Sequence, residues 1–194
     1  MLLKLCKLLH RFIFWSGIYM WWSKRYRRLY QSRYTVPLPG INPIDIVLSK
    51  LKLLKWTRDG PRELWDAVGS PHWVQHCINH RLAGHKQPEG ALDCEDFAVY
   101  AAAVLPPSYD PVVLGAYWYG EEGWKGHGVC LYHLDDGAYY YIGNWGNLGP
   151  FLGPLEVLRD LLSRPAGEKA LIGWARYTTD LRTIDYGTSE DTIT

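Results

Sequence analysis

The stretch Asp93-Cys94-Glu95-Asp96-Phe97-Ala98 leads directly into the apolar run VYAAAVL at residues 99–105. Most of these residues favour or tolerate a helix, and Pro106-Pro107 would end one. Asp93 is a good N-cap residue, and Asp96 lies three positions later, as a capping box requires. We therefore expect a buried helix whose first residue is Cys94.

A cysteine at the first position of a helix lies near unpaired N–H groups and the positive end of the helix dipole, which favour a thiolate. Glu95 and Asp96 oppose this effect, so a thiolate at Cys94 would need a cationic partner, for which a histidine is the natural candidate. The alternative is that Cys94 is a small apolar residue at the start of a core helix.

The composition is that of a globular protein with one sizeable core. The chain has 194 residues, of which 47% are hydrophobic and 21% are charged, which excludes a disordered chain. Ten Trp and fourteen Tyr predict a large packed or partner-facing aromatic surface. The four cysteines form no CxxC pair, which argues against a disulfide scaffold or a cysteine-rich zinc site. A reducing, cytoplasmic compartment is expected.

Residues 1–34 form a basic, aromatic extension. They hold eight Lys or Arg and no acid, whereas the remainder holds 13 basic and 20 acidic residues. An amphipathic helix is expected here, with one apolar face made of Leu2, Leu5, Leu9, Phe12 and Ile13. This face is suited to binding at a membrane surface, to packing into a larger protein assembly such as a viral particle, or to docking on the domain of the same chain. No nucleic-acid-binding motif is present, so no specific nucleic-acid partner is expected.

The remaining sequence divides into a Pro/Gly linker at residues 35–43, a domain at residues 44–178 and a polar tail at residues 179–194. Helices are expected at residues 44–56, 61–68, 71–83 and 155–162, besides the one that Cys94 begins. Strands are expected at residues 111–119, 126–134, 138–144 and 170–178, with a hairpin turn at residues 135–137. The fold class is therefore α+β.

His72, His76 and His80 recur every four residues on the expected helix at 71–83, with His85 just beyond. They share one narrow sector of that helix, and two histidines at i and i+4 can bind one metal ion. No glutamate is interleaved and no further ligand is evident, so a solvent-facing polar stripe is expected. A metal site and an accessory role near an active site are the alternatives, and no cofactor is expected.

Cys94, His127 and Asn144 follow one another on a helix, a strand and the next strand. In that order a thiol attacks a carbonyl group, a histidine moves the proton, and an amide or carboxylate orients the imidazole. Period-two alternation places His127 on the sheet face opposite Cys130, which is expected to be a core residue.

Over roughly residues 60–178 the chain resembles the bacterial transglutaminase-like cysteine proteinases of the transglutaminase-like, papain-related superfamily. The resemblance rests on DCEDFA at 93–98, GHGV at 126–129 and YIGN at 141–144. It implies a papain-like α+β fold, in which a central helix bearing the nucleophile packs on an antiparallel sheet. It also implies thiol-dependent attack on an amide of a peptide or protein.

This chain departs from the family pattern at two places. Leu92 stands where glycine is common, and Gly143-Asn144 stands where the third catalytic residue is usually Asp, so that Asn144 would orient His127. Gln87 lies near the position of papain's glutamine and is the candidate oxyanion donor, with Gln75 and Trp73 as alternatives.

The leading functional hypothesis is a cysteine peptidase or amidase with Cys94 as nucleophile, His127 as base and acid, and Asn144 as orienting residue. An acyl transferase would use the same residues with an amine in place of water. A hypothesis from another functional class is that the chain is an inactive scaffold in a membrane-bound or virion-type assembly.

Overall fold

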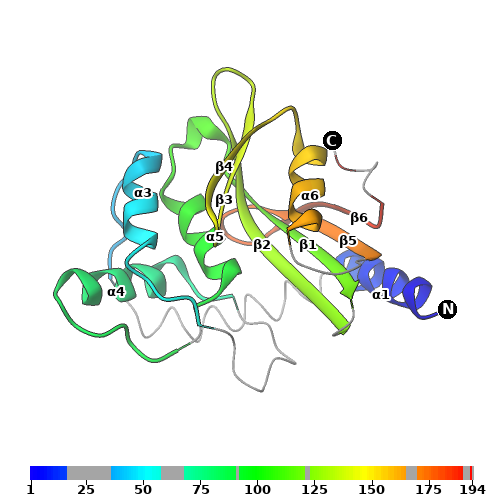
Figure 1. The fold of residues 1–194 in the computed structure, drawn as a ribbon, viewed down its shortest axis with the longest axis horizontal. Coiled ribbons are helices and arrows are strands. Elements are labelled where there is room, and N and C mark those ends of the chain that lie inside the picture. Colours follow the sequence, from blue (N-terminus) through cyan, green and yellow to red (C-terminus); the bar gives the residue numbers. More distant parts are fainter. Residues whose placement is uncertain are drawn as a thin grey trace.

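The computed structural model describes residues 1–16, 36–57, 68–90, 92–120, 123–164, 170–189 and 193. In this part of the chain, helices cover both faces of one antiparallel sheet, which gives an α+β fold (Figure 1). The six strands run in the order β4-β3-β2-β1-β5-β6. Their bounds are β1 Val112–Gly120, β2 Gly123–His133, β3 Tyr139–Gly143, β4 Gly146–Phe151, β5 Ala170–Tyr177 and β6 Thr183–Gly187.

The central helix α5, Cys94–Val104, packs on one face of the sheet against β1, β2 and β3. It is in turn covered by α3, Ile44–Leu51, and α4, Pro71–Leu82. On the other face lies α6, Pro154–Ser163, which contacts β1, β3 and β4. The remaining elements are α1, Leu2–Ser16, and a short 3-10 turn, Pro107–Tyr109.

Two hydrophobic clusters lie on the two faces because strand side chains alternate. On the α5 face, Val113, Cys130 and Tyr132 meet the helix. On the α6 face, Leu114, Val129 and Leu131 pack against the helix α6. The expected core position of Cys130 is therefore confirmed, and its side chain is fully buried.

The helices begin close to where the sequence predicts. Ser70 caps α4 by accepting from the Trp73 N–H at 3.3 Å, and Gly84 follows the helix with a φ of +77°. The helix expected at 44–56 ends at Leu51, and Leu82 at the end of α4 is exposed. The helix expected at 61–68 falls almost wholly outside the described residues.

Two strands were not expected from the sequence. Although Gly and Pro are frequent in residues 146–151, β4 forms there at one edge of the sheet, where proline is tolerated. The tail expected from residue 179 contains β6, which forms the other edge. Arg176 on β5 holds Asp185 on β6 by a two-point ion pair, which helps to fix this strand.

The helix α1 packs on β5 and β6 at one end of the sheet (Figure 1). Its side chain His10 is buried, donates from Nε2 to the Trp174 carbonyl at 3.3 Å and lies directly against Gly173. Lys7 donates to the Thr188 carbonyl at 3.1 Å. None of the helices in the described ranges has the length and apolar character needed to cross a bilayer.

Candidate functional site

Cys94 is the first residue of α5, as predicted. The expected capping box is present: the Asp93 side chain accepts from the Asp96 N–H, and Asp96 Oδ2 accepts from the Asp93 N–H at 3.2 Å. The cap fixes the backbone on both sides of Cys94. The candidate nucleophile is therefore carried by a rigid helix start.

Asp96 also ties α5 to the chain that precedes α4. Its Oδ1 accepts from the Gly69 N–H at 2.5 Å, and the side chain is only 2% exposed. A Cβ at Gly69 would lie 2.6 Å from this oxygen, so only glycine permits so close an approach. The third acid of the DCED motif, Asp96, is thus a structural residue.

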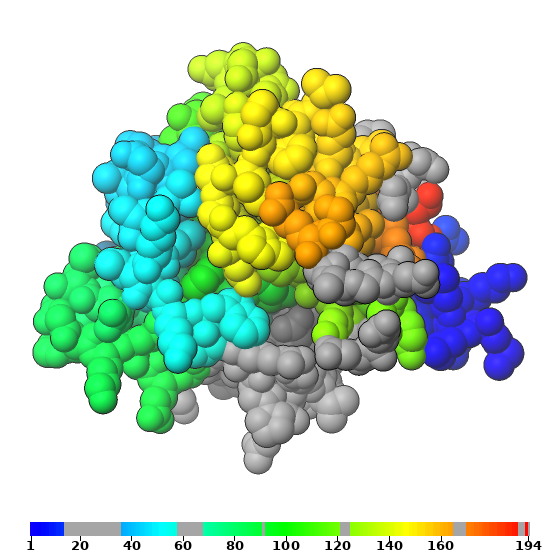
Figure 2. Space-filling view, viewed as in Figure 1, coloured from blue at the N-terminus to red at the C-terminus, as the bar shows by residue number. Residues whose placement is uncertain are grey.

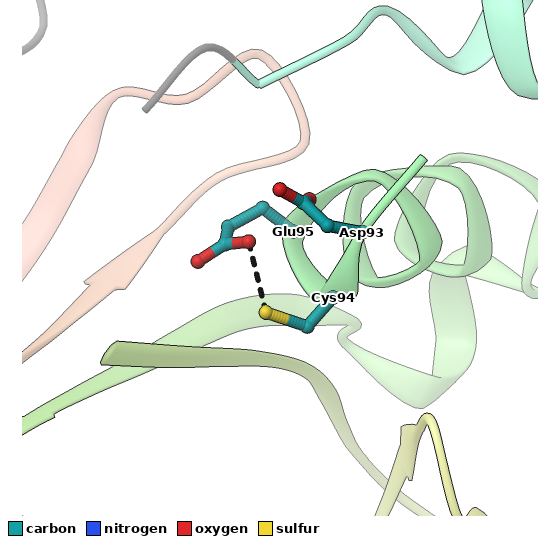
Figure 3. Close-up of side chains that lie close together, drawn as sticks. All are labelled: Asp93, Cys94 and Glu95. Carbon is teal, nitrogen blue, oxygen red and sulfur yellow. Dashed lines mark hydrogen bonds between the residues drawn. The ribbon is translucent and has the colours of Figure 1, made fainter. Parts of the chain in front are cut away.

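The thiol of Cys94 is hydrogen-bonded to its own neighbour. Sγ donates to Glu95 Oε2 at 2.9 Å, and the carboxylate turns back along the helix start to reach it (Figure 3). Cys94 is 8% exposed. Burial, followed by the charges of Glu95 and Asp93, raises the pKa of the Cys94 thiol well above its ordinary value. The resting form is consequently a thiol, because these effects outweigh the helix dipole.

Cys94 and Glu95 both lie against strand β2 at Gly128, the residue that follows His127. The Gly128 N–H stabilises negative charge on the Cys94 sulfur, and a Cβ at Gly128 would lie 3.1 Å from Glu95 Cγ. The β2–β3 ladder runs from Cys130↔Ile142 to His133↔Tyr139, so it ends before Gly128. The sulfur therefore lies where β3 no longer pairs with β2.

His127 is nearly buried, at 9% exposed, and burial lowers the pKa of its imidazole to about 4. It is neutral at physiological pH and can accept a proton. Its Nε2 is buried and has no hydrogen-bond partner within the described structure. An unpaired buried nitrogen is costly, and a catalytic role is one explanation for such an atom.

The Cys94 sulfur and the His127 imidazole lie on opposite faces of strand β2. The pairing of β1 with β2 is regular, so His127 points to the same face as Val129, whereas Gly128 faces α5. Among the described residues no hydrogen bond joins the two side chains, since Sγ donates to Glu95 and Nε2 is unpaired. The structure thus places the His127 imidazole on the α6 face of the sheet and the Cys94 sulfur on the α5 face, next to Gly128, and does not bring the two groups together.

The position expected for Asn144 is wrong. The strand β3 ends at Gly143, and Asn144 lies exposed in the turn before β4. The residue that faces the imidazole is Gly143, since a Cβ built on it would lie 3.7 Å from His127 Nε2. The sequence overestimated the strand by one residue, and a shift of one residue reverses the side-chain direction. No orienting side chain reaches His127 from this position.

Trp145 is a neighbour of His127 that the sequence analysis missed. The two ring centroids are 4.7 Å apart and the rings are tilted by 45°. The Arg164 guanidinium group lies over the Trp145 ring, with Cζ 5.3 Å from the ring centroid. The only sequence signal was that an aromatic residue directly follows the proposed triad position.

A recess opens beside Glu95 on the α5 face of the sheet. Its empty volume, which is open to solvent, is about 320 Å³. Small residues and an aromatic ring form its floor, with Gly115, Gly128 and Tyr117 among them, and apolar side chains such as Val68 and Leu181 form its sides. Glu95 and the Tyr117 hydroxyl occupy the space above Gly128 and Gly115, so the recess is shallow and has room for about one water molecule.

The expected oxyanion donors are engaged elsewhere. The side-chain amide of Gln87 makes two hydrogen bonds to the backbone of Lys55. Its Oε1 accepts from the Lys55 N–H at 2.7 Å, and its Nε2 donates to the Lys55 carbonyl at 2.9 Å. Gln75 accepts from the Tyr100 hydroxyl at 2.7 Å between α4 and α5. These amides brace the helices and the loop, which corrects the assignment of Gln87 to the site. Among the described residues we assign no second oxyanion donor to act beside the Cys94 N–H.

The three histidines of α4 do not converge on one point. His72 Nδ1 lies 2.6 Å from the Val36 carbonyl, whereas His76 and His80 have ring centroids 4.5 Å apart. In the described ranges, the one group of three metal-ligating side chains whose ligand atoms lie within 4.8 Å of one another is Asp93, Cys94 and Glu95. The bond from Cys94 to Glu95 accounts for part of that grouping, so we assign no metal to it.

No protein-family model matches the chain, and no curated protein matches it in sequence.

Proposed function

We propose that the protein is a thiol-dependent amide hydrolase, with Cys94 as nucleophile and His127 as general base and acid. The observation that carries the proposal is the contact of Cys94 with β2 at Gly128, the residue next to His127 in the chain, although the two side chains lie on opposite faces of the sheet. A helix-borne sulfur and a neutral, unpartnered imidazole nitrogen are the two groups that this chemistry needs. We further propose that the α+β fold is of the papain-like type implied by the resemblance to transglutaminase-like cysteine proteinases.

The proposed reaction requires the His127 ring to turn past the end of the β2–β3 ladder to the Cys94 side of β2. The Cys94 thiol then leaves Glu95 and transfers its proton to His127 as sulfur attacks the carbonyl carbon. The C–N bond then breaks, His127 returns the proton to the departing amine, and a thioester remains on Cys94. Water attacks the thioester with His127 again accepting a proton, which releases the acid and restores the thiol. An acyl transferase would differ only in the last step, where a primary amine replaces water.

The low pKa of His127 favours a neutral thiol and imidazole over a preformed ion pair. In this mode the proton moves during the attack, as in serine hydrolases. The recess beside Glu95 is the proposed acyl site, and because Glu95 and Tyr117 occupy the space above Gly128 and Gly115, these side chains have to move for a substrate to enter. Peptide or protein amides are the proposed substrates.

All four cysteines are free and buried. Free cysteines suit a reducing compartment, and we place the protein in the cytoplasm on this ground.

A second candidate function is an inactive scaffold of the same fold in a larger assembly. Two observations favour it: Gly143 offers no orienting side chain to His127, and Glu95 holds the Cys94 thiol protonated. An inactive scaffold predicts that Cys94 reacts no faster than a buried cysteine with no function.

The test uses p-nitrophenyl acetate, which acylates a nucleophilic thiol whatever the natural substrate is. The wild type should release p-nitrophenolate and carry the acetyl group on Cys94, located by peptide mass spectrometry, and Cys94→Ala should abolish this. Equal rates for the wild type and Cys94→Ala would remove the enzymatic proposal and leave the scaffold. Adding a primary amine then distinguishes transfer from hydrolysis by the product formed.

A further inference from the structure

The outer surface of α1 carries a row of exposed apolar side chains, which we call the apolar stripe. Its members are between 49% and 64% exposed: Leu2, Leu5, Leu8, Leu9 and Phe12. Single exposed leucines are common, but a contiguous row of five on one helix marks an interaction surface. In Figure 2 this helix lies at the edge of the molecule, with side chains that project away from the body.

The orientation of the apolar stripe is fixed by the rest of the fold. The buried residues of α1 are Cys6 and His10, and His10 fits against Gly173, where there is no room for a Cβ. Lys7 adds its bond to the Thr188 carbonyl. At about 100° per residue, these residues lie on the side of the helix opposite Leu5 and Leu8. The expectation that Leu2, Leu5, Leu9 and Phe12 would dock on the domain is therefore excluded for α1 in this structure.

Positive charge borders the apolar stripe. Lys4 and Arg11 are exposed and occupy the sector next to Leu8, on the side away from Cys6. Residues 1–34 contain eight basic residues and no acid, although the remainder of the chain is acidic overall. Within α1 itself the charged residues are Lys4, Lys7 and Arg11, and the helix carries no acid.

We propose that the apolar stripe of α1 is a docking surface for an anionic lipid membrane. A helix with an apolar sector flanked by Lys and Arg lies in the plane of a bilayer, with leucines among the acyl chains and cations at the headgroups. A lipid surface satisfies both the apolar and the basic sectors. A second copy of α1 would instead bring two sets of like charges together along the same border, which disfavours a dimer.

The position of α1 also suits this mode of binding. The helix has 15 residues, or about 22 Å at 1.5 Å per residue, and lies on the surface of the sheet, where it can contact a bilayer along its length. The docked protein would be held at the membrane by a surface contact that depends on ionic strength.

The test is co-sedimentation of the full chain with vesicles of phosphatidylglycerol and phosphatidylcholine, or of phosphatidylcholine alone. The double variant Leu5→Glu/Leu9→Glu should lower binding to the anionic vesicles at least about tenfold, because it removes apolar insertion and adds negative charge. The matched control is Leu82→Glu/Leu152→Glu, which alters two exposed leucines elsewhere and should leave binding within about twofold. All four leucines are exposed, so the unfolding temperature should not change.

Lys4→Gln/Arg11→Gln should weaken binding by about fivefold per charge removed, and added salt should do the same for the wild type. Equal binding by the wild type and by Leu5→Glu/Leu9→Glu would overturn the proposal, as would equal binding to neutral and anionic vesicles. A third contrary outcome is a wild-type dimer in light scattering that Leu5→Glu/Leu9→Glu dissociates, with no vesicle binding. None of these outcomes depends on the activity of Cys94.

Discussion

The thiol of Cys94 donates its hydrogen to the Glu95 carboxylate at 2.9 Å, so the residue after the candidate nucleophile is also its hydrogen-bond acceptor. The Glu95 charge is, after burial, the largest of the effects that raise the pKa of the thiol. Glu95 also lines the recess proposed to hold the acyl group. A bound substrate that displaces Glu95 would therefore both fill the recess and release the thiol.

Replacing Glu95 by Gln should make Cys94 more reactive. Loss of the negative charge lowers the pKa of the thiol toward its ordinary range, and each unit of that shift raises the thiolate fraction about tenfold below the pKa. The measurement is the rate of iodoacetamide labelling of Cys94 from pH 7 to 10, with each cysteine mapped separately. Glu89→Gln, at an exposed position, is the matched control, and an unchanged pH profile for Glu95→Gln would contradict the assigned role.

Gly128→Ala should destabilise the fold by about 1–3 kcal/mol, because the added methyl group would lie 3.1 Å from Glu95 Cγ and 3.3 Å from its Cα. The helix start would have to move away from β2. Urea unfolding gives the free energy, and Gly40→Ala serves as the control because no atom lies within 4 Å of a Cβ built there. A Gly128→Ala protein as stable as the control would show that α5 does not pack so closely on β2.

Asp96→Ala should cost about 2–4 kcal/mol. The carboxylate loses its bond to the Gly69 N–H and its half of the capping box, and both donors are left unpaired near the core. Asp96→Asn should retain part of this stability because its amide oxygen can still accept one bond. The exposed Asp45→Ala provides the baseline; a cost for Asp96→Ala no larger than this baseline would argue against the bridge to Gly69.

The stability of the protein should fall between pH 6.5 and pH 4. The folded-state pKa of His127 is about 4, whereas that of an unfolded histidine is 6.5, so the unfolded chain takes up the proton first. The loss from His127 amounts to at most about 3 kcal/mol, and His10, with a pKa also lowered to about 4, adds a similar amount. Stability is full above pH 6.5 and decreases as the pH drops through this window.

The variant His127→Gln isolates one of these contributions. Its free energy of unfolding, measured in urea at several pH values, should decrease less steeply than that of the wild type over the same window. His85→Gln, at an exposed position, controls for the loss of a histidine. Parallel curves for the wild type and His127→Gln would mean that His127 is not buried as a neutral ring.

The sequence predicted the elements whose local signals agree with their packing. The N-caps of α4 and α5, the glycine after α4 and the hairpin turn between β2 and β3 all depend on residues close in the chain. The two edge strands were missed for a physical reason. Edge strands tolerate Gly and Pro, and β6 is held largely by pairing with β5, which no local pattern reveals.

The sequence predicted the helix position of Cys94 but not the arrangement of the other candidate site residues around it. Cys94 lies at its expected helix position, but the turn after Gly143 moves Asn144 out of reach of His127, and a difference of one residue decides this. The hydrophobic pattern of α1 identified an apolar face but left open whether that face docks on the domain. The contact with the domain is made by His10 and the small Gly173, which lie far apart in the chain.

The most direct test of the central claim is the rate at which p-nitrophenyl acetate acylates Cys94 in the wild type and in His127→Ala, with folding of both confirmed by circular dichroism. If His127 takes the proton of the Cys94 thiol, removing the imidazole should slow acylation by about 100-fold or more at neutral pH. Equal rates in the two proteins, or an acetyl group on a cysteine other than Cys94, would contradict the account.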